Sequence, residues 1–248
     1  MRDYAELVAT ARPYLRELAE KTGEATTLAI EVDGVAVSVD MVDTPRPFRR
    51  EVAVGRIIGD TANASGKVFA AFKTGADRKE VLARPHRQLT PRTITDPEAL
   101  AKELDLVAGQ ELAFDTEERN VGTCAVAAPV RDQLGDAAAV ISVVVPSGRF
   151  GPKEKIRCAR AVKSTAKRLS CFLGYGSTGW SQAVALLGRP QELCGSSPRY
   201  LGARPHSAEQ AKEVAELAAQ ARGPGNRERY NRFTEDVELL NTSNKAFD

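Results

Sequence analysis

Three acidic residues and one cysteine stand close together in the middle of the chain, and their side chains are suited to chemistry. Asp115, Glu117 and Glu118 fall within four residues, and Cys124 follows at the start of an apolar run. A carboxyl group can transfer protons, and a thiolate can act as a nucleophile. Each also has an ordinary interpretation: Asp115 can brace the loop before Cys124, the thiol can be a buried structural group, and the two glutamates can be solvated.

A segment of small residues provides a second candidate site. Residues 62–66 read Ala-Asn-Ala-Ser-Gly at the start of a predicted helix, where a ligand could approach N–H groups that favour an anion. Tight helix packing is the alternative interpretation. Ser142 lies in an otherwise apolar strand, where its hydroxyl needs a partner: a ligand, a backbone group or water.

Metal and cofactor chemistry is not expected. The chain has four cysteines without a Cys-x-x-Cys pair and only two histidines. It has no Gly-x-Gly-x-x-Gly, no P-loop and no Gly-x-Ser-x-Gly motif. We therefore predict neither a metal nor a cofactor.

Charge and hydropathy narrow the classes of partner. The 35 basic and 33 acidic residues leave a net charge of +2, and no basic stripe is evident, so we expect no direct contact with nucleic acid. No signal peptide and no run long enough to cross a bilayer is found. We expect no membrane partner and a cytoplasmic location.

The elements that must position these residues are predicted from periodicity. Helical spacing indicates helices over residues 3–22, 63–72, 76–84, 97–107 and 152–173. Pro13 is expected to kink or divide the first, and Asp96 or Thr95 to cap the fourth. Strands are predicted over residues 26–32, 35–42, 48–54, 112–116, 122–130 and 137–145. Asp33-Gly34 suits a type I′ turn, and residues 55–59 are expected to form a loop.

The order of these elements predicts an α+β fold. Strands joined by hairpins, with helices grouped apart from them, favour a largely antiparallel sheet flanked by helices. The strand over residues 137–145 is continuously apolar and should lie in the middle of the sheet. We assign residues 1–175 to this main domain. Residues 176–248 are predicted to be an extension of helices (208–222 and 227–240) and loops, whose role stays open.

Four sequence blocks, in order, resemble the effector-binding domain of IclR-type bacterial transcription regulators. They are ARPYLRELAEKTGE at residues 11–24, NASGKVFAA at 63–71, LTPRTITDP at 89–97, and DTEER with GTCAVAAPV at 115–119 and 122–130. The resemblance implies a GAF-like antiparallel sheet between helices, with an effector pocket on one face. It also implies self-association as a dimer or tetramer. It covers roughly residues 5–175.

The resemblance also assigns residues to that pocket. The start of the helix would contribute Ala64 and Ser65. The sheet would contribute Asp115, Cys124 and Ser142. The apolar wall of the pocket would be formed by Ile58 and Val144. The chain departs from the family pattern at four points. We expect the chain to lack the family's winged helix-turn-helix, the loop before Cys124 to be one residue shorter, and the extension to have no counterpart in the family. Val144 and Val145 replace a common Ser and Gly, which implies a less polar ligand.

Three functions are compatible with this sequence. The leading hypothesis is a sensor domain that binds a small organic acid or apolar metabolite and lacks its own DNA-binding domain. The second is a domain recruited as a biosynthetic enzyme, which would promote cyclisation or rearrangement with Asp115 as acid or base and Cys124 as nucleophile. The third is a regulatory partner that forms inactive heterodimers with full-length relatives.

Overall fold

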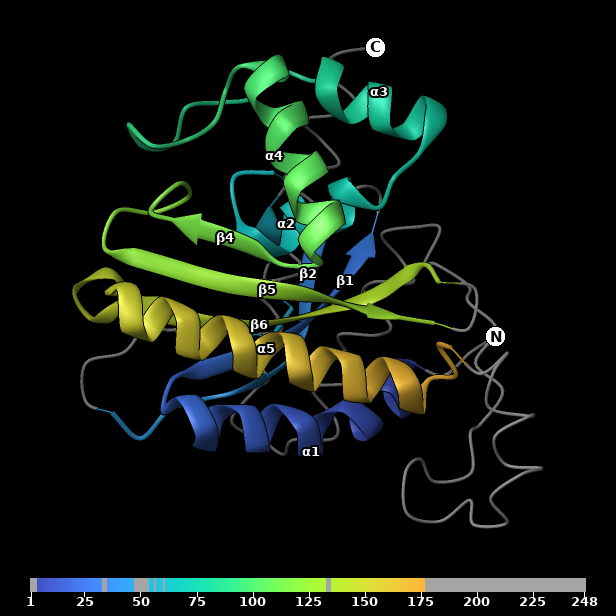
Figure 1. Ribbon diagram of the computed structural model, residues 1–248, viewed down its shortest axis with the longest axis vertical. Helices are drawn as coiled ribbons and strands as arrows, with labels where there is room; N and C mark the ends of the chain where they lie inside the picture. The colour runs from blue at the N-terminus through green and yellow to red at the C-terminus, as the bar shows by residue number, and fades with distance from the viewer. Residues whose placement is uncertain are drawn as a thin grey trace.

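The computed structural model describes residues 4–32, 35–46, 54–55, 57–59, 61–132 and 135–176. Within these residues, six strands form one antiparallel sheet in the order β3-β2-β1-β6-β5-β4 (Figure 1). The strands are β1 (Ala25–Val32), β2 (Val35–Val42), β3 (Ile57–Gly59), β4 (Ala113–Thr116), β5 (Thr123–Arg131) and β6 (Ala137–Pro146). The predicted α+β class with an antiparallel sheet is confirmed.

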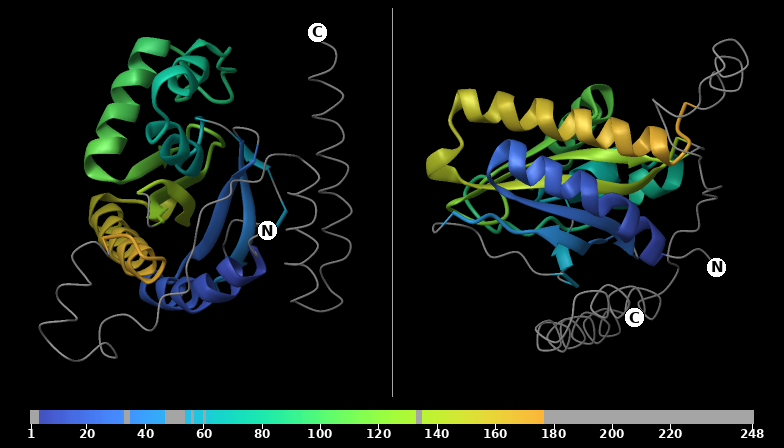
Figure 2. Two further views of the ribbon diagram at one scale, coloured as in Figure 1. Left: turned by 90° about the vertical axis from the view of Figure 1, so that its right-hand side faces the viewer. Right: turned by 90° about the horizontal axis from the view of Figure 1, so that it is seen from below.

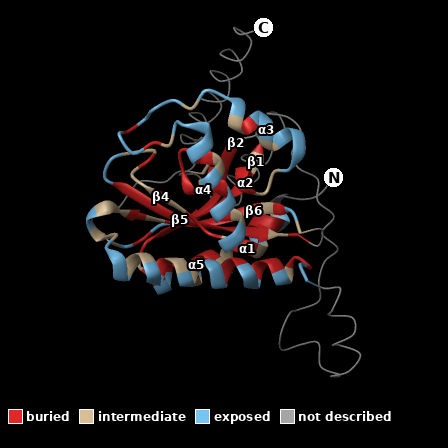
Figure 3. Cartoon of the chain, turned by 45° about the horizontal axis from the view of Figure 1, so that its top comes forward, coloured by how far each residue is buried: buried red, intermediate tan, exposed pale blue. Residues whose placement is uncertain are grey.

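Helices cover both faces of the sheet. The helices are α1 (Tyr4–Thr22), α2 (Ala64–Ala71), α3 (Gly75–Ala83), α4 (Pro97–Gln110) and α5 (Pro152–Phe172), with a 3-10 turn η1 (Ser147–Arg149). The long helices α1 and α5 lie side by side on one face, while α2, α3 and α4 gather on the other (Figures 1 and 2). The buried sheet between these layers is clear in Figure 3.

The alternation of strand side chains divides the core into two clusters. Leu28 and Ile141 pack with α1 and α5 in the first cluster, whereas Ala29 and Val140 pack with α2 and α4 in the second. The strands β1 and β6 contribute apolar side chains to both clusters, and β6 is the fourth of the six strands in the sheet order. The prediction that residues 137–145 lie in the middle of the sheet is therefore confirmed.

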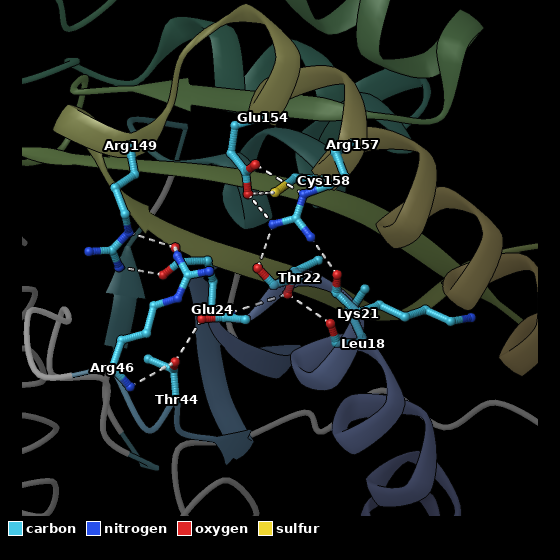
Figure 4. A network of polar contacts seen from close by, with 11 residues as sticks. Leu18, Lys21, Thr22, Glu24, Thr44, Arg46, Arg149, Glu154, Arg157 and Cys158 are labelled. Atoms are coloured by element: carbon cyan, nitrogen blue, oxygen red, sulfur yellow. Dashed lines mark hydrogen bonds and ion pairs between the residues drawn. The ribbon is translucent and has the colours of Figure 1, made fainter.

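An ionic network joins the end of α1 to the start of α5 (Figure 4). Glu24, whose side chain is 1% exposed, accepts hydrogen bonds from Arg46 at 2.7 Å and from Arg149 at 2.7 and 2.8 Å. Arg157 on α5 donates to the carbonyl oxygens of Lys21 and Thr22, which are left without intrahelical donors at the end of α1. These contacts fix α1 against the rest of the first layer.

Some predicted elements differ in the structure. Residues 55–59 were expected to be a loop, which is wrong for Ile57–Gly59: this short edge strand pairs with β2. Pro13 lies inside one continuous helix, α1. The predicted strand over residues 48–54 and the Asp33-Gly34 turn lie mostly or wholly outside the described residues, as do the helices predicted beyond residue 176. No described helix is both long and apolar enough to cross a membrane.

Candidate functional site

Small and polar side chains line the face of the sheet that α2 covers. The strand register aligns Asp115, Ala125 and Val144 in one row across β4, β5 and β6. The next row along the strands consists of Ala113, Ala127, Ser142 and Thr27. Because neighbouring strands lie about 4.8 Å apart, the row from Asp115 to Val144 spans about 10 Å. That width matches a small ligand.

The start of α2 lies over this face. Asn63 caps the helix: its side-chain oxygen accepts a hydrogen bond from the Gly66 N–H at 2.9 Å, and its Nδ2 donates to the Ile58 carbonyl at 2.9 Å. The second bond ties β3 to the helix start. Ala64 and Ser65 follow the cap and are both buried, as expected where a helix approaches a sheet closely.

Asp115 is the buried acid of the site. Its side chain stands on the α2 side of the edge strand β4, its residue is 4% exposed, and its Oδ1 accepts a hydrogen bond from the Glu118 N–H at 2.7 Å. Burial raises the pKa of Asp115 to about 6, and the nearby Glu118 carboxylate adds to this increase. Asp115 therefore changes charge close to neutral pH.

Ser142 and Thr27 meet across the central strands. Their hydroxyl oxygens are 2.6 Å apart, and both residues are buried. One hydroxyl donates to the other, so the partner that Ser142 needs is at least partly supplied by Thr27. The accepting hydroxyl keeps its own hydrogen as a donor. The pair thus provides a polar spot on an otherwise apolar face.

The two predicted apolar wall residues come from the edge strand β3 and the central strand β6. Ile58 on β3 is half-buried and packs against the second cluster, to which Ala64 also belongs. Val144 on β6 is half-buried beside Ala125. The structure therefore places six of the seven predicted pocket residues around the α2 layer and its side of the sheet.

Cys124 is the exception. It pairs with Val145 of β6, and Val145 belongs to the cluster under α1 and α5, so alternation directs Cys124 to that face. Its neighbour Ala125 is the residue opposite Asp115. Burial also raises the pKa of the Cys124 thiol to about 11. At neutral pH the thiol is therefore protonated, which disfavours the nucleophile role.

The sequence did not predict the buried ionic network that Lys67 forms with Glu118 and Glu103. Glu118 was expected to be solvated, which is wrong: it is 7% exposed, and its Oε1 lies 2.7 Å from Nζ of Lys67. Glu117 is half-buried and accepts a hydrogen bond from the Gly122 N–H. Lys67 gave no signal beyond its place in the NASGKVFAA block, because its burial depends on tertiary packing. Among the described residues, no group of three metal-ligating side chains is found.

Comparisons with known proteins agree with this architecture. Residues 2–171 match the family described as bacterial transcriptional regulator IclR C-terminal. The chain is 34% identical over 165 residues to the HTH-type transcriptional regulator BhcR of Paracoccus denitrificans, covering 66% of this chain and 59% of that one. It is 30% identical over 172 residues to the HTH-type transcriptional regulator KdgR of Escherichia coli, covering 68% and 65%. The chain thus spans about six-tenths of these relatives.

Solved structures show the same fold. The C-terminal domain of E. coli KdgR is 29% identical with a TM-score of 0.62, and the match covers 68% of this chain and 99% of that domain. The Thermotoga maritima IclR structure is 27% identical with a TM-score of 0.64, covering 67% and 68%. The chain therefore belongs to the IclR family, and its described part is the effector-binding C-terminal domain of that family.

Proposed function

We propose that this domain is a sensor that binds a small organic acid or a weakly polar metabolite between α2 and the sheet. The observation that carries the proposal is the pair of side-chain rows on the sheet face under α2. These rows contain several alanines, the Asp115 carboxyl group on the edge strand β4, and the Thr27–Ser142 hydroxyl pair on the central strands. A mostly apolar surface with a few convergent polar groups is typical of small-molecule sites.

The lining favours a compact ligand with one polar end. Ala125 and Ala127 leave little side-chain volume above β5, and Val144 adds an apolar wall. A carboxylate would approach the N–H groups of Ala64 and Ser65 at the start of α2, where the helix dipole favours negative charge. The hydroxyl pair would hold a second polar atom.

Regulation would follow from a difference in affinity. A ligand shifts a protein between two arrangements only if it binds one of them better. Relatives named as transcriptional regulators suggest that the arrangement in question is that of DNA-binding domains in a dimer or tetramer. We place that role in the cytoplasm, where such regulators act.

The sensor proposal is tested by ligand retention. The purified chain is incubated with a pool of small organic acids and related neutral metabolites, and bound molecules are identified by native mass spectrometry. We expect Ala125→Leu, which fills the row beside Asp115, to abolish retention. Cys124→Ala is the matched control on the same strand and should retain the ligand. Retention lost equally in both variants, or never observed in the wild type, would contradict the proposal.

A second function keeps one supporting observation. The pKa of Asp115, at about 6, suits proton transfer near neutral pH, so the enzyme hypothesis retains a candidate acid or base. The orientation of Cys124 and the raised pKa of its thiol give it no nucleophile there. Liquid chromatography of the same incubations decides between the two. Conversion of a pool member that Asp115→Ala abolishes would replace the sensor proposal with catalysis.

A further inference from the structure

Lys67 is the most deeply buried basic side chain among the described residues, at 1% exposed. It lies in α2, three residues after Ala64. Its Nζ donates to Oε1 of Glu118 at 2.7 Å, to the Phe114 carbonyl at 2.9 Å and to Oε1 of Glu103 at 3.0 Å. One ammonium group therefore connects α2 to strand β4, to the loop after β4 and to α4.

These contacts use the full donor capacity of the ammonium group. An ammonium has three N–H donors, and Lys67 directs them at three oxygens. Burial of the charge is tolerable because two carboxylates and a carbonyl replace its water. Lys67 thus has no donor left for a ligand, and any effect on ligand binding must act through its partners.

The partner that matters is Glu118, because its backbone holds Asp115. The Glu118 N–H donates to Oδ1 of Asp115 at 2.7 Å. The carbonyl of the same residue accepts a hydrogen bond from the Thr93 hydroxyl at 2.6 Å. Glu117, which lies between Asp115 and Glu118 in the chain, has a left-handed backbone angle φ of 61°. A non-glycine residue adopts this angle only when its surroundings require it. The turn is therefore held from several sides.

We propose that Lys67 is a positioning residue of the ligand site: its ammonium group holds Glu118 and β4 so that the Asp115 carboxyl faces the start of α2. The inference rests on the proposed function only in treating that face as the ligand site. The geometry itself assigns the mechanical link, from α2 through Glu118 to Asp115.

The charges around Asp115 make the link measurable. Glu118 follows it in the loop, Lys67 of α2 pairs with Glu118, and Glu103 of α4 pairs with Lys67. Burial and the Glu118 carboxylate raise the pKa of Asp115. Burial also raises the pKa of Glu118, and the Lys67 ammonium group opposes that increase. Arg92 lies beyond, beside Glu117.

The test needs no ligand, so it fails or succeeds independently of the sensor proposal. Amide hydrogen exchange and carboxyl NMR titration are measured on the whole chain for wild type, Lys67→Met and Lys73→Met. Lys73 is the matched control: it follows the same helix and pairs at 3.1 Å with Glu31 on β1, three strands from β4, with both side chains largely buried. We expect Lys67→Met to speed exchange in residues 115–122 by about tenfold or more relative to Lys73→Met. It should also raise the pKa of Glu118.

A second variant keeps the test decisive if Lys67→Met does not fold. Glu118→Gln keeps the shape of the side chain and an oxygen for Lys67 but removes the charge. We expect the pKa of Asp115 to fall in this variant, with the fold intact by NMR. Exchange of residues 115–122 that is unchanged or equally affected by both lysine variants would overturn the proposal. An Asp115 titration unaffected by Glu118→Gln would overturn it as well.

Discussion

Replacing Asp115 with asparagine should remove a specific dependence of stability on pH. The pKa of Asp115 is raised from 3.8 to about 6, mainly by burial. Between these values the folded protein binds a proton that the unfolded chain does not, so stability falls as the pH rises through this window. At 1.36 kcal/mol per pKa unit, the full effect is about 3 kcal/mol. Roughly 2 kcal/mol of it develops between about pH 4.5 and pH 7.5.

Urea denaturation at a series of pH values measures this effect. In the Asp115→Asn variant the amide side chain is neutral throughout, and its oxygen can still accept the Glu118 N–H. We therefore expect the stability of Asp115→Asn relative to wild type to increase by about 2 kcal/mol from about pH 4.5 to pH 7.5. Subtracting the two curves removes the contributions of other titrating groups. Parallel curves over this range would refute the assignment of Asp115 as a buried, destabilised carboxylate.

Three further outcomes are expected. Glu24→Gln removes the charge that two arginines surround and should lower the free energy of unfolding by about 2 kcal/mol, measured by chemical denaturation; no loss would contradict the network's role. Thr27→Val and Ser142→Ala should each lower the free energy of unfolding by about 1 to 3 kcal/mol, because each leaves one buried hydroxyl without its partner. In a double-mutant cycle, the double variant should lose less than the sum of the two single losses, and simple additivity would contradict the pairing. Iodoacetamide should modify the exposed Cys171 long before the buried Cys124, as mass spectrometry would show; equal rates would argue against the burial of Cys124.

Local sequence patterns predicted the helices and strands for which apolar spacing, capping residues and turn residues all indicate the same element. The apolar spacing of α5, and the proline and capping aspartate of α4, identified those helices. The alternating and apolar runs identified β1, β2, β5 and β6. The edge strand Ile57–Gly59 was missed because three residues, the last of them a glycine, are too short a segment to show periodicity. Its pairing with β2 is a tertiary event.

The candidate site was predictable by residue type and less so by orientation. Asp115 and Ser142 reach the expected face because strand register carries them there. Cys124 does not, because it pairs with Val145 of the opposite cluster, and neighbouring residues of a strand face opposite sides of the sheet. Ala125 takes the place expected for the cysteine. Lys67 and Glu118 were beyond sequence reasoning because a buried ion pair joins segments 51 residues apart.

We expect a ligand to bind on the α2 side of the sheet. The most direct measurement is an NMR titration of the labelled chain with an acid retained in the native mass spectra. We predict that the largest chemical-shift changes occur at Ala64, Ser65, Asp115 and Ser142, and that residues on the α1–α5 side change little. Changes centred instead on Leu15 of α1 and on Cys158 of α5 would contradict the account.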